Sequence, residues 1–329
     1  MRSCILLFVV GCLAITTYSC KKKEIPSVEF AQEMRDFIID LSVHAKSTNP
    51  EFIVIPQNGA KLLSIDEEST TEIDLDYISA IDGQGQEDLF FGYDKDDKKS
   101  DVAFQNELIP FLNLGKNEGI TILVTDYCSS SENIVLSKSK NTDKGYLSFA
   151  ATERELNVIS DVAINNSNNE DIIKLDDAKN FLYIINPSNY EEKVDLIAAL
   201  DATNYDAFII DFFDNDGYPL TNVDIEKLQT KPNGAKRLVI SYMSIGEAED
   251  YRYYWNSNWE KRKNEPAWLY GENKKWKGNF KVFYWMSDWQ SIIFGNTDAY
   301  LDRIVAAGFD GVYLDIVSGY EFFEDEKSK

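Results

Sequence analysis

Short apolar segments that recur along the chain, separated by helix-like stretches, constrain its fold more than any other feature. They are rich in Ile, Val, Phe and Tyr and do not alternate cleanly with polar residues, which is typical of parallel strands buried on both faces. Between them, Met34, Phe37, Ile38 and Leu41 show helical spacing, and the helical pattern over 301–308 ends at a glycine that can stop a helix. The predicted strands cover residues 52–55, 77–81, 120–125, 181–185, 207–211, 237–242, 281–285 and 311–315, with 146–150 as a weaker further candidate.

Strands interleaved with helices predict the α/β class and, for this number of strands, a single (β/α)8 TIM barrel. A doubly wound open sheet is the alternative. No GxGxxG or P-loop pattern follows any predicted strand, so the nucleotide-binding versions of that sheet lack their usual signature. The Asn-rich stretch 165–180 is interpreted as a connection between two halves of one barrel domain (30–329), namely 30–160 and 181–325, because neither half has enough strands to close alone.

The N-terminus has the features of an export signal. Arg2 precedes an apolar core over 5–15 that is too short to span a bilayer comfortably. The sequence TYSC at 17–20 resembles a relaxed bacterial lipobox. We therefore expect a lipoprotein signal peptide over 1–19, lipid attachment at Cys20 and a tether over 20–29, with ordinary secretion as the alternative. This predicts a protein of the bacterial cell envelope, on its periplasmic or cell-surface face, whose only membrane contact is the lipid anchor.

Charge and residue counts exclude several classes of chemistry. The 56 acidic residues exceed the 33 basic ones, for a net charge of -23, so a nucleic-acid partner is not expected. The single histidine, His44, is interpreted as a surface or packing residue, and multi-histidine zinc sites are impossible. Carboxylates and aromatic rings must therefore carry any chemistry, and we expect no cofactor and no metal.

Acidic or amide residues follow several of the predicted strands. Any one of them could cap a helix, but all carboxyl ends of a parallel barrel open on one face, where catalytic residues lie. Two carboxyl groups without histidine or cysteine suit glycoside hydrolysis, in which one acid protonates the leaving oxygen and the other attacks the sugar or activates water. A divalent cation held by the same oxygens is the alternative. The residues are Gln57, Asn58, Asp82, Asp126, Asp211, Glu247, Glu249, Asp250 and Asp315.

All six tryptophans lie between residues 255 and 289, together with several tyrosines. Flat aromatic faces suit the apolar faces of sugar rings, but burial of area explains most such residues. We expect one to three of the tryptophans to line a cleft.

Four sequence blocks resemble glycoside hydrolase family 114: SYMSIGEAEDYR at 241–252, GFDGVYLD at 308–315, IPQNG at 55–59 and DGQGQEDLF at 82–90. The resemblance implies a TIM-barrel glycosidase, and the characterised members of that family are endo-acting on α-1,4-linked galactosamine polymers. In the usual relatives the first two blocks precede the last two, whereas here they follow them. This order indicates a circular permutation, which a barrel tolerates because its first and last strands are neighbours. It predicts that strand 311–315 pairs in parallel with strand 52–55.

Two positions depart from the pattern of these relatives. Met286 stands where an acid often follows a Tyr-Trp pair, and Tyr313 stands where many active members have Glu two residues before the acid that matches Asp315. A sugar-binding envelope lipoprotein that has lost catalysis is therefore the alternative to an enzyme.

The sequence as a whole is interpreted as an exported glycoside hydrolase that cleaves a polysaccharide, with galactosamine-containing polymers as candidate substrates. We predict Asp211 or Asp315 as nucleophile and Glu247 as acid/base. The predicted sugar-binding residues are Gln57, Asn58, Asp82, Glu87, Asp126, Tyr242, Arg252, Tyr284 and Trp285.

Overall fold

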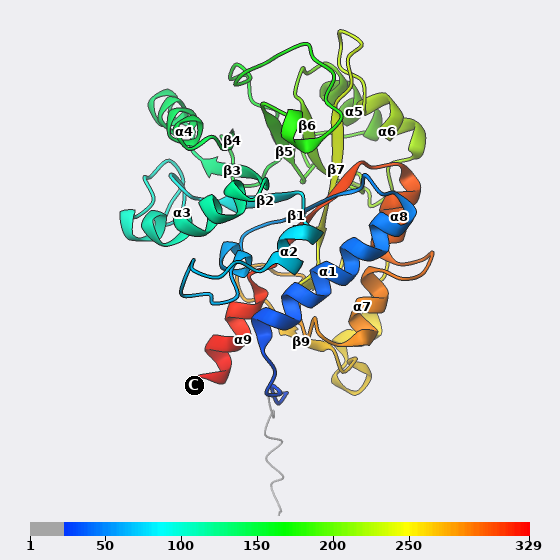
Figure 1. Ribbon diagram of the computed structural model, residues 1–329. Coiled ribbons are helices and arrows are strands. Elements are labelled where there is room, and N and C mark those ends of the chain that lie inside the picture. Colours follow the sequence, from blue (N-terminus) through cyan, green and yellow to red (C-terminus); the bar gives the residue numbers. More distant parts are fainter. Residues whose placement is uncertain (1–22) are drawn as a thin grey trace, which may run out of the picture.

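The computed structural model describes residues 23–329 (Figure 1). The predicted signal peptide over 1–19 and the predicted lipid attachment at Cys20 lie outside the described residues. Of the predicted tether, residues 23–29 are described, and the Lys23 Nζ donates to the Pro266 carbonyl at 2.7 Å. No helix within the described part of the chain is long and apolar enough to cross a bilayer.

Two parallel sheets form the centre of the fold. A five-stranded sheet has the order β1-β11-β7-β6-β5, and a three-stranded sheet has the order β2-β3-β4. Neighbouring strands in both sheets all run parallel to each other, and the strands are buried almost throughout. The bounds are β1 (Ile53–Pro56), β2 (Gly83–Glu87), β3 (Thr121–Tyr127), β4 (Leu147–Ala151), β5 (Phe181–Ile184), β6 (Ala207–Asp211), β7 (Leu238–Ser244) and β11 (Gly311–Asp315).

The two sheets approach each other along both pairs of edges. Beside β1 and β2, Gln57 forms an isolated parallel bridge with Gly85. Beside β4 and β5, the rings of Phe149 and Phe181 lie 5.7 Å apart between centroids. The fold is thus mixed α/β with parallel sheets, and it is compatible with a TIM-like barrel. The predicted parallel pairing of residues 311–315 with 52–55 is confirmed, since Ile53 pairs with Gly311 and Pro56 with Leu314.

Helices surround these strands (Figure 1). The helix predicted from Met34, Phe37, Ile38 and Leu41 is confirmed as α1, and all four side chains are buried. Gly308 ends α8 with φ of 91°, a left-handed conformation that glycine adopts without a steric penalty. The bounds are α1 (Phe30–Thr48), α2 (Leu75–Ala80), α3 (Val102–Asn117), α4 (Ser131–Lys144), α5 (Lys193–Asp201), α6 (Asn222–Leu228), α7 (Ser287–Ile293), α8 (Tyr300–Ala307) and α9 (Gly319–Lys327).

Two of the predicted strands are wrong. Residues 77–81 lie mostly in helix α2, because Asp74 caps its start by accepting a hydrogen bond from the Tyr77 N–H at 3.0 Å. The strand that follows is β2, whose sequence GQGQE has no apolar side chain and therefore gives no hydrophobic signal. Glycine is required within it, because a Cβ on Gly85 would lie 2.1 Å from the Tyr313 hydroxyl oxygen.

The second wrong strand is 281–285. Here the strand β10 (Asn279–Val282) ends at Val282 and pairs antiparallel with β8 (Glu247–Glu249) and β9 (Leu269–Glu272) in a separate small sheet. The weaker candidate at 146–150 is a strand of the three-stranded parallel sheet, β4. The number of parallel strands therefore agrees with the prediction, but the predicted strands 77–81 and 281–285 are not among them.

The Asn-rich stretch 165–180 is held to the core by hydrogen bonds to a buried ion pair between Asp206 and Lys231. The Asp206 carboxylate lies 2.7 Å from the Lys231 Nζ, and both side chains are 0% exposed. Asp206 also accepts hydrogen bonds from the Asn168 amide at 2.8 Å and from the Lys179 N–H at 2.7 Å. Since Asp206 directly precedes β6, this cluster lies at the amino ends of the strands.

Candidate active site

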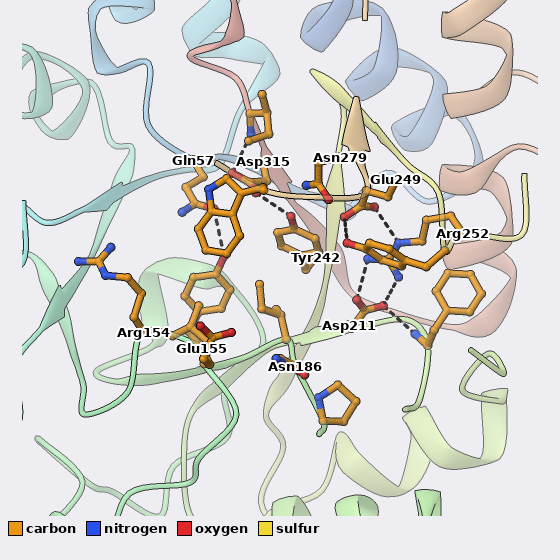
Figure 2. A pocket seen from close by; sticks show the side chains of 18 of the residues that line it. Gln57, Arg154, Glu155, Asn186, Asp211, Tyr242, Glu249, Arg252, Asn279 and Asp315 are labelled. Carbon is orange, nitrogen blue, oxygen red and sulfur yellow. Dashed lines mark hydrogen bonds and ion pairs between the residues drawn. The ribbon is translucent and has the colours of Figure 1, made fainter. Parts of the chain in front are cut away.

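A pocket of about 670 Å³ opens at the carboxyl ends of the strands (Figure 2). The loops after β4, β5 and β6 and the small sheet containing β8 and β10 contribute the rest of its lining. The ionisable lining is mostly acidic, since seven carboxyl groups face two arginines: Glu87, Glu155, Asp211, Asp214, Asp216, Glu249 and Asp315 against Arg154 and Arg252. The predicted sugar-site residues Gln57, Asn58, Glu87, Tyr242 and Arg252 all line this pocket.

Asp315, the last residue of β11, is a pocket-lining acid held by two hydrogen bonds. Its carboxylate accepts from the Tyr242 hydroxyl at 2.6 Å and from the N–H of Ile316 at 2.7 Å. No ion pair with a cation is formed by Asp315 among the described residues. Burial, together with the nearby charges of Glu249 and Glu247, raises the pKa of Asp315 to about 6, although the hydrogen bond from Tyr242 acts in the opposite direction.

Glu87, the last residue of β2, is a second pocket acid without a cationic partner among the described residues. The Tyr127 hydroxyl donates to its Oε1, and the Asn58 Nδ2 donates to its Oε2 at 3.3 Å. Burial, followed by the charge of Asp315, raises the pKa of Glu87 to about 7. The charge of Asp315 thus acts on Glu87, and both carboxyl groups line the same pocket.

Asp211, at the end of β6, is paired with a cation instead. The Arg252 guanidinium donates to both of its oxygens, at 2.8 and 2.7 Å, in a bidentate arrangement (Figure 2). The same guanidinium donates through Nε to Glu249 at 2.7 Å, and Tyr251 donates to Glu249 at 2.6 Å. Despite the opposing effect of burial, the carboxylates of Asp211 and Glu249 hold the pKa of Arg252 well above its usual range.

Glu247, the predicted acid/base, does not line the pocket. Its buried carboxylate accepts from the Lys281 Nζ and from the Asn273 amide, both at 2.8 Å. Glu249, two residues later on β8, lines the pocket in its place. The pairing of β8 with β10 accounts for this, because Glu247 lies opposite Lys281 whereas Glu249 lies opposite the pocket-lining Asn279.

Two further predicted acids lie away from the pocket. Asp82 precedes β2, at the amino end of the strands, where it accepts from the Val54 N–H at 2.9 Å and pairs with Lys46 at 3.0 Å. The predicted strand at 77–81, which is wrong, would place Asp82 at the carboxyl end of a strand. Asp126 is buried against helix α4 and accepts from Ser137 at 2.6 Å. Successive strand side chains point to opposite faces, so the next residue, Tyr127, faces the pocket.

Tyr284 and Trp285 are also outside the pocket lining. Tyr284 is buried and donates to the Phe30 carbonyl at 2.7 Å, and the Trp285 ring lies 5.3 Å from that of Phe30. Both residues therefore pack against the start of α1. Of the tryptophans, Trp276 lines the pocket and is 54% exposed. This agrees with the expectation that one to three of them would do so.

Tyr313, at one of the departures from the family pattern, fills space beneath the pocket. Its ring lies 5.1 Å from that of Tyr183, and Tyr183 in turn donates to Gln57 at 3.1 Å. Burial and the charges of Glu87 and Asp315 raise the pKa of Tyr313, so its hydroxyl stays neutral. Met286, the other departure, is the N-cap residue of α7 and packs partly buried against the core.

Several pocket residues have no signal in the sequence that marks them as functional. Tyr127 is the last residue of an apolar strand, and Arg154 and Asn186 lie in loops that follow β4 and β5. Glu249 is the exception, because it belongs to the SYMSIGEAEDYR block and follows a predicted strand. The missed lining residues include Tyr127, Arg154, Tyr183, Asn186 and Asn279.

Comparison with known sequences gives a family and several relatives. The sequence model of the glycoside hydrolase family GH114 matches residues 165–329, which is half of the chain. An uncharacterized protein of Methanocaldococcus jannaschii is 42% identical over 127 residues, covering 37% of this chain and 33% of the relative. An uncharacterized protein of Deinococcus radiodurans is 38% identical over 123 residues, covering 37% and 36%. One of Thermotoga maritima is 42% identical over 87 residues, covering 26% and 25%. The chain thus matches only a quarter to about a third of the length of these curated relatives.

Proposed function

Because the chain belongs to glycoside hydrolase family GH114, we propose that it hydrolyses glycosidic bonds with Asp315 and Glu87 as its catalytic pair. One observation carries this assignment. These two pocket-lining carboxyl groups are held by hydroxyl, amide and backbone donors, without an ion pair among the described residues, and each has a raised pKa. Two acids of this kind meet the requirement of glycoside hydrolysis for one protonated and one ionised group.

The difference between the two pKa values divides the roles. Glu87, with a pKa of about 7, is the general acid that protonates the leaving glycosidic oxygen. Asp315, with a pKa of about 6, is ionised at neutral pH and attacks the anomeric carbon or activates a water molecule. Asp211 is engaged by both Nη atoms of Arg252, so we assign it and Glu249 to sugar positioning instead of nucleophilic attack.

An extracellular or envelope polysaccharide with amino sugars is the substrate that we propose. The seven carboxyl groups of the pocket lining favour a cationic amine by charge complementarity. The exposed Trp276 ring at the rim offers a flat surface for a sugar face. Endo-acting cleavage and galactosamine units are part of this proposal through the family resemblance. Anchoring at the bacterial envelope through Cys20 is part of it through the N-terminal sequence.

The proposal includes a closed (β/α)8 barrel with a permuted strand order. The parallel bridge between Gln57 and Gly85 and the contact of Phe149 with Phe181 support closure, because each joins edges of the two sheets. The family match begins at residue 165, within the Asn-rich connection, and leaves the preceding half unmatched. A circular permutation that exchanges the two halves of the family's sequence would give this pattern.

We predict a narrow bell-shaped pH profile for kcat. Activity should rise as Asp315 loses its proton near pH 6 and fall as Glu87 loses its proton near pH 7. Steady-state rates between pH 4 and 9 would show it. With an aryl glycoside whose leaving group needs no proton, Glu87→Gln should remove the alkaline limb. Persistence of that limb in the variant would assign it to another group.

Release of reducing ends tests the function itself. The soluble protein, residues 21–329, would be incubated with purified polysaccharides that include galactosamine polymers and N-acetylated controls. Release by the wild type that is lost in Glu87→Gln and Asp315→Asn supports the proposal. Binding measured by calorimetry without any release would replace it with the sugar-binding lipoprotein that the residues Met286 and Tyr313 had suggested.

A further inference from the structure

The Glu87 carboxyl group is fixed by side chains from strand ends that the family match, residues 165–329, does not reach. The Tyr127 hydroxyl, at the end of β3, donates to Glu87 Oε1. The Asn58 Oδ1 accepts from the Glu87 N–H at 3.1 Å and from the Gln86 amide at 3.1 Å. These two bonds orient the Asn58 amide so that its Nδ2 faces Glu87 Oε2. Each carboxyl oxygen thus has its own donor.

Tyr127 is itself held in place by Arg154 from the loop after β4. The Arg154 guanidinium carbon lies 3.8 Å from the centroid of the Tyr127 ring, which is cation–π stacking distance. Hydrogen bonds orient the guanidinium group, since Nε donates to Asp96 at 2.6 Å and Nη2 donates to both Asp88 and the Gly92 carbonyl at 2.9 Å. These hydrogen bonds hold the plane of the guanidinium group over the Tyr127 ring.

The loop between β2 and α3 is shaped to accept this stack. Gly92 has φ of 116°, and a Cβ at this position would lie 2.2 Å from Asp88 Oδ1, 3.0 Å from Arg154 Nη2 and 3.0 Å from the Tyr127 Cβ. The same loop is fastened at Asp97, whose Oδ1 accepts from the N–H groups of Ser129 and Ser130 at 3.0 Å. The stacked Arg154 and Tyr127 side chains are thus supported by the ends of β2, β3 and β4 and by the loop between β2 and α3.

We propose that Arg154 and Tyr127 form a positioning clamp that fixes the Glu87 carboxyl group and keeps its acidic proton on Oε2. This inference rests on the proposed function of Glu87 as general acid. Oε1 is committed to accepting from Tyr127, and the carbonyl oxygen of a protonated carboxyl is the better acceptor. The Asn58 amide also donates to Oε2, but at 3.3 Å this bond is long and weak. The proton of neutral Glu87 therefore resides on Oε2, so that Oε2 is the oxygen that delivers it to the leaving group. Arg154 thus acts on Glu87 through Tyr127.

A carboxyl titration that needs no substrate tests the clamp. The ¹³C carboxyl resonance of Glu87, identified by its absence in Glu87→Gln, would be followed with pH in the folded protein. Tyr127→Phe removes a hydrogen bond that favours the ionised carboxylate, so the Glu87 midpoint should rise by about one pH unit. Arg154→Lys should shift it in the same direction, and adding Arg154→Lys to Tyr127→Phe should change nothing further. An unchanged midpoint in Tyr127→Phe, or additive shifts in the double variant, would overturn the proposal.

Kinetics provide the second readout. In Tyr127→Phe, kcat should fall roughly tenfold with little change in KM, because the negative charge that develops on Glu87 as it gives up its proton loses a hydrogen bond. The alkaline limb of its pH profile should move upward, so the variant loses least at high pH. The matched control is Tyr146→Phe, since Tyr146 also donates to a side chain, Asn113 at 2.7 Å, beneath a lysine but outside the pocket. The pH profile of Tyr146→Phe should be the same as that of the wild type.

The outcomes separate this inference from the proposed function. If Glu87→Gln abolishes hydrolysis while Tyr127→Phe leaves both the titration and the pH profile unchanged, the clamp is wrong and Glu87 remains the acid. If no polysaccharide is hydrolysed, the titration alone decides whether Tyr127 and Arg154 hold this carboxyl group. Thermal melts of each variant confirm that the folded state is being compared.

Discussion

Replacing Asp315 by Asn should lower kcat by about four orders of magnitude, an effect of the size seen when a nucleophile or an essential base is removed. Asn has nearly the shape of Asp and can still accept from the Tyr242 hydroxyl, so the fold and the pocket should persist. It cannot ionise, and it is a poor nucleophile. KM, or the binding constant for an uncleaved oligosaccharide, should therefore change little while turnover is lost.

Asp82→Asn is the matched control for this experiment. It makes the same chemical change at an acid that also follows a predicted strand in the sequence, but Asp82 lies at the amino ends of the strands beside Lys46. Its kcat should stay within about twofold of the wild type, since surface ion pairs contribute little. Equal losses in the two variants would mean that Asn substitutions act here through stability. A fully active Asp315→Asn protein would remove Asp315 from the chemistry altogether.

The second large effect concerns stability and not activity. Lys231→Met should reduce the free energy of unfolding by about 3–5 kcal/mol, because it leaves the carboxylate of Asp206 buried without its countercharge. The remaining donors, Asn168 and the Lys179 N–H, do not neutralise that charge. Unfolding in urea, analysed by linear extrapolation, would measure the loss. Since the pair lies at the amino ends of the strands, kcat of the folded fraction should be unchanged.

Lys227→Met provides a nearby comparison for this change. Lys227 pairs with Asp201 at 3.5 Å, but the two side chains are 52% and 36% exposed. Water screens such a pair, so its loss should cost less than about 1 kcal/mol. If Lys231→Met cost no more than this control, the buried pair would not be what fastens the 165–180 connection to the core.

Local patterns in the sequence were sufficient for much of the fold. Apolar spacing predicted α1, and the glycine at 308 marked the end of α8, because both depend on neighbours within a few residues. The order of the sequence blocks predicted the pairing of β1 with β11. The strand β2 was missed because its side chains are Gly, Gln and Glu, so hydrophobicity gave no indication of its burial.

Motif and strand-end patterns also narrowed the site, without choosing among its acids. They placed Asp211, Asp315 and Glu87 among the candidates, and all three line the pocket. Glu247 and Glu249 cannot be told apart in the sequence, since both belong to one block. Their difference arises from the antiparallel pairing with β10, which sets Lys281 opposite Glu247.

The sequence by itself determined the α/β class, the family and the rim of carboxyl groups, because each follows from residue type and order along the chain. Only the tertiary structure decided which acids are paired with a cation and which are not. The ionisation of a buried carboxyl depends on burial and on partners brought together from separate strand ends. Tyr127 and Arg154 beside Glu87, and Arg252 beside Asp211, are such partners, and they are far apart from those acids in the sequence.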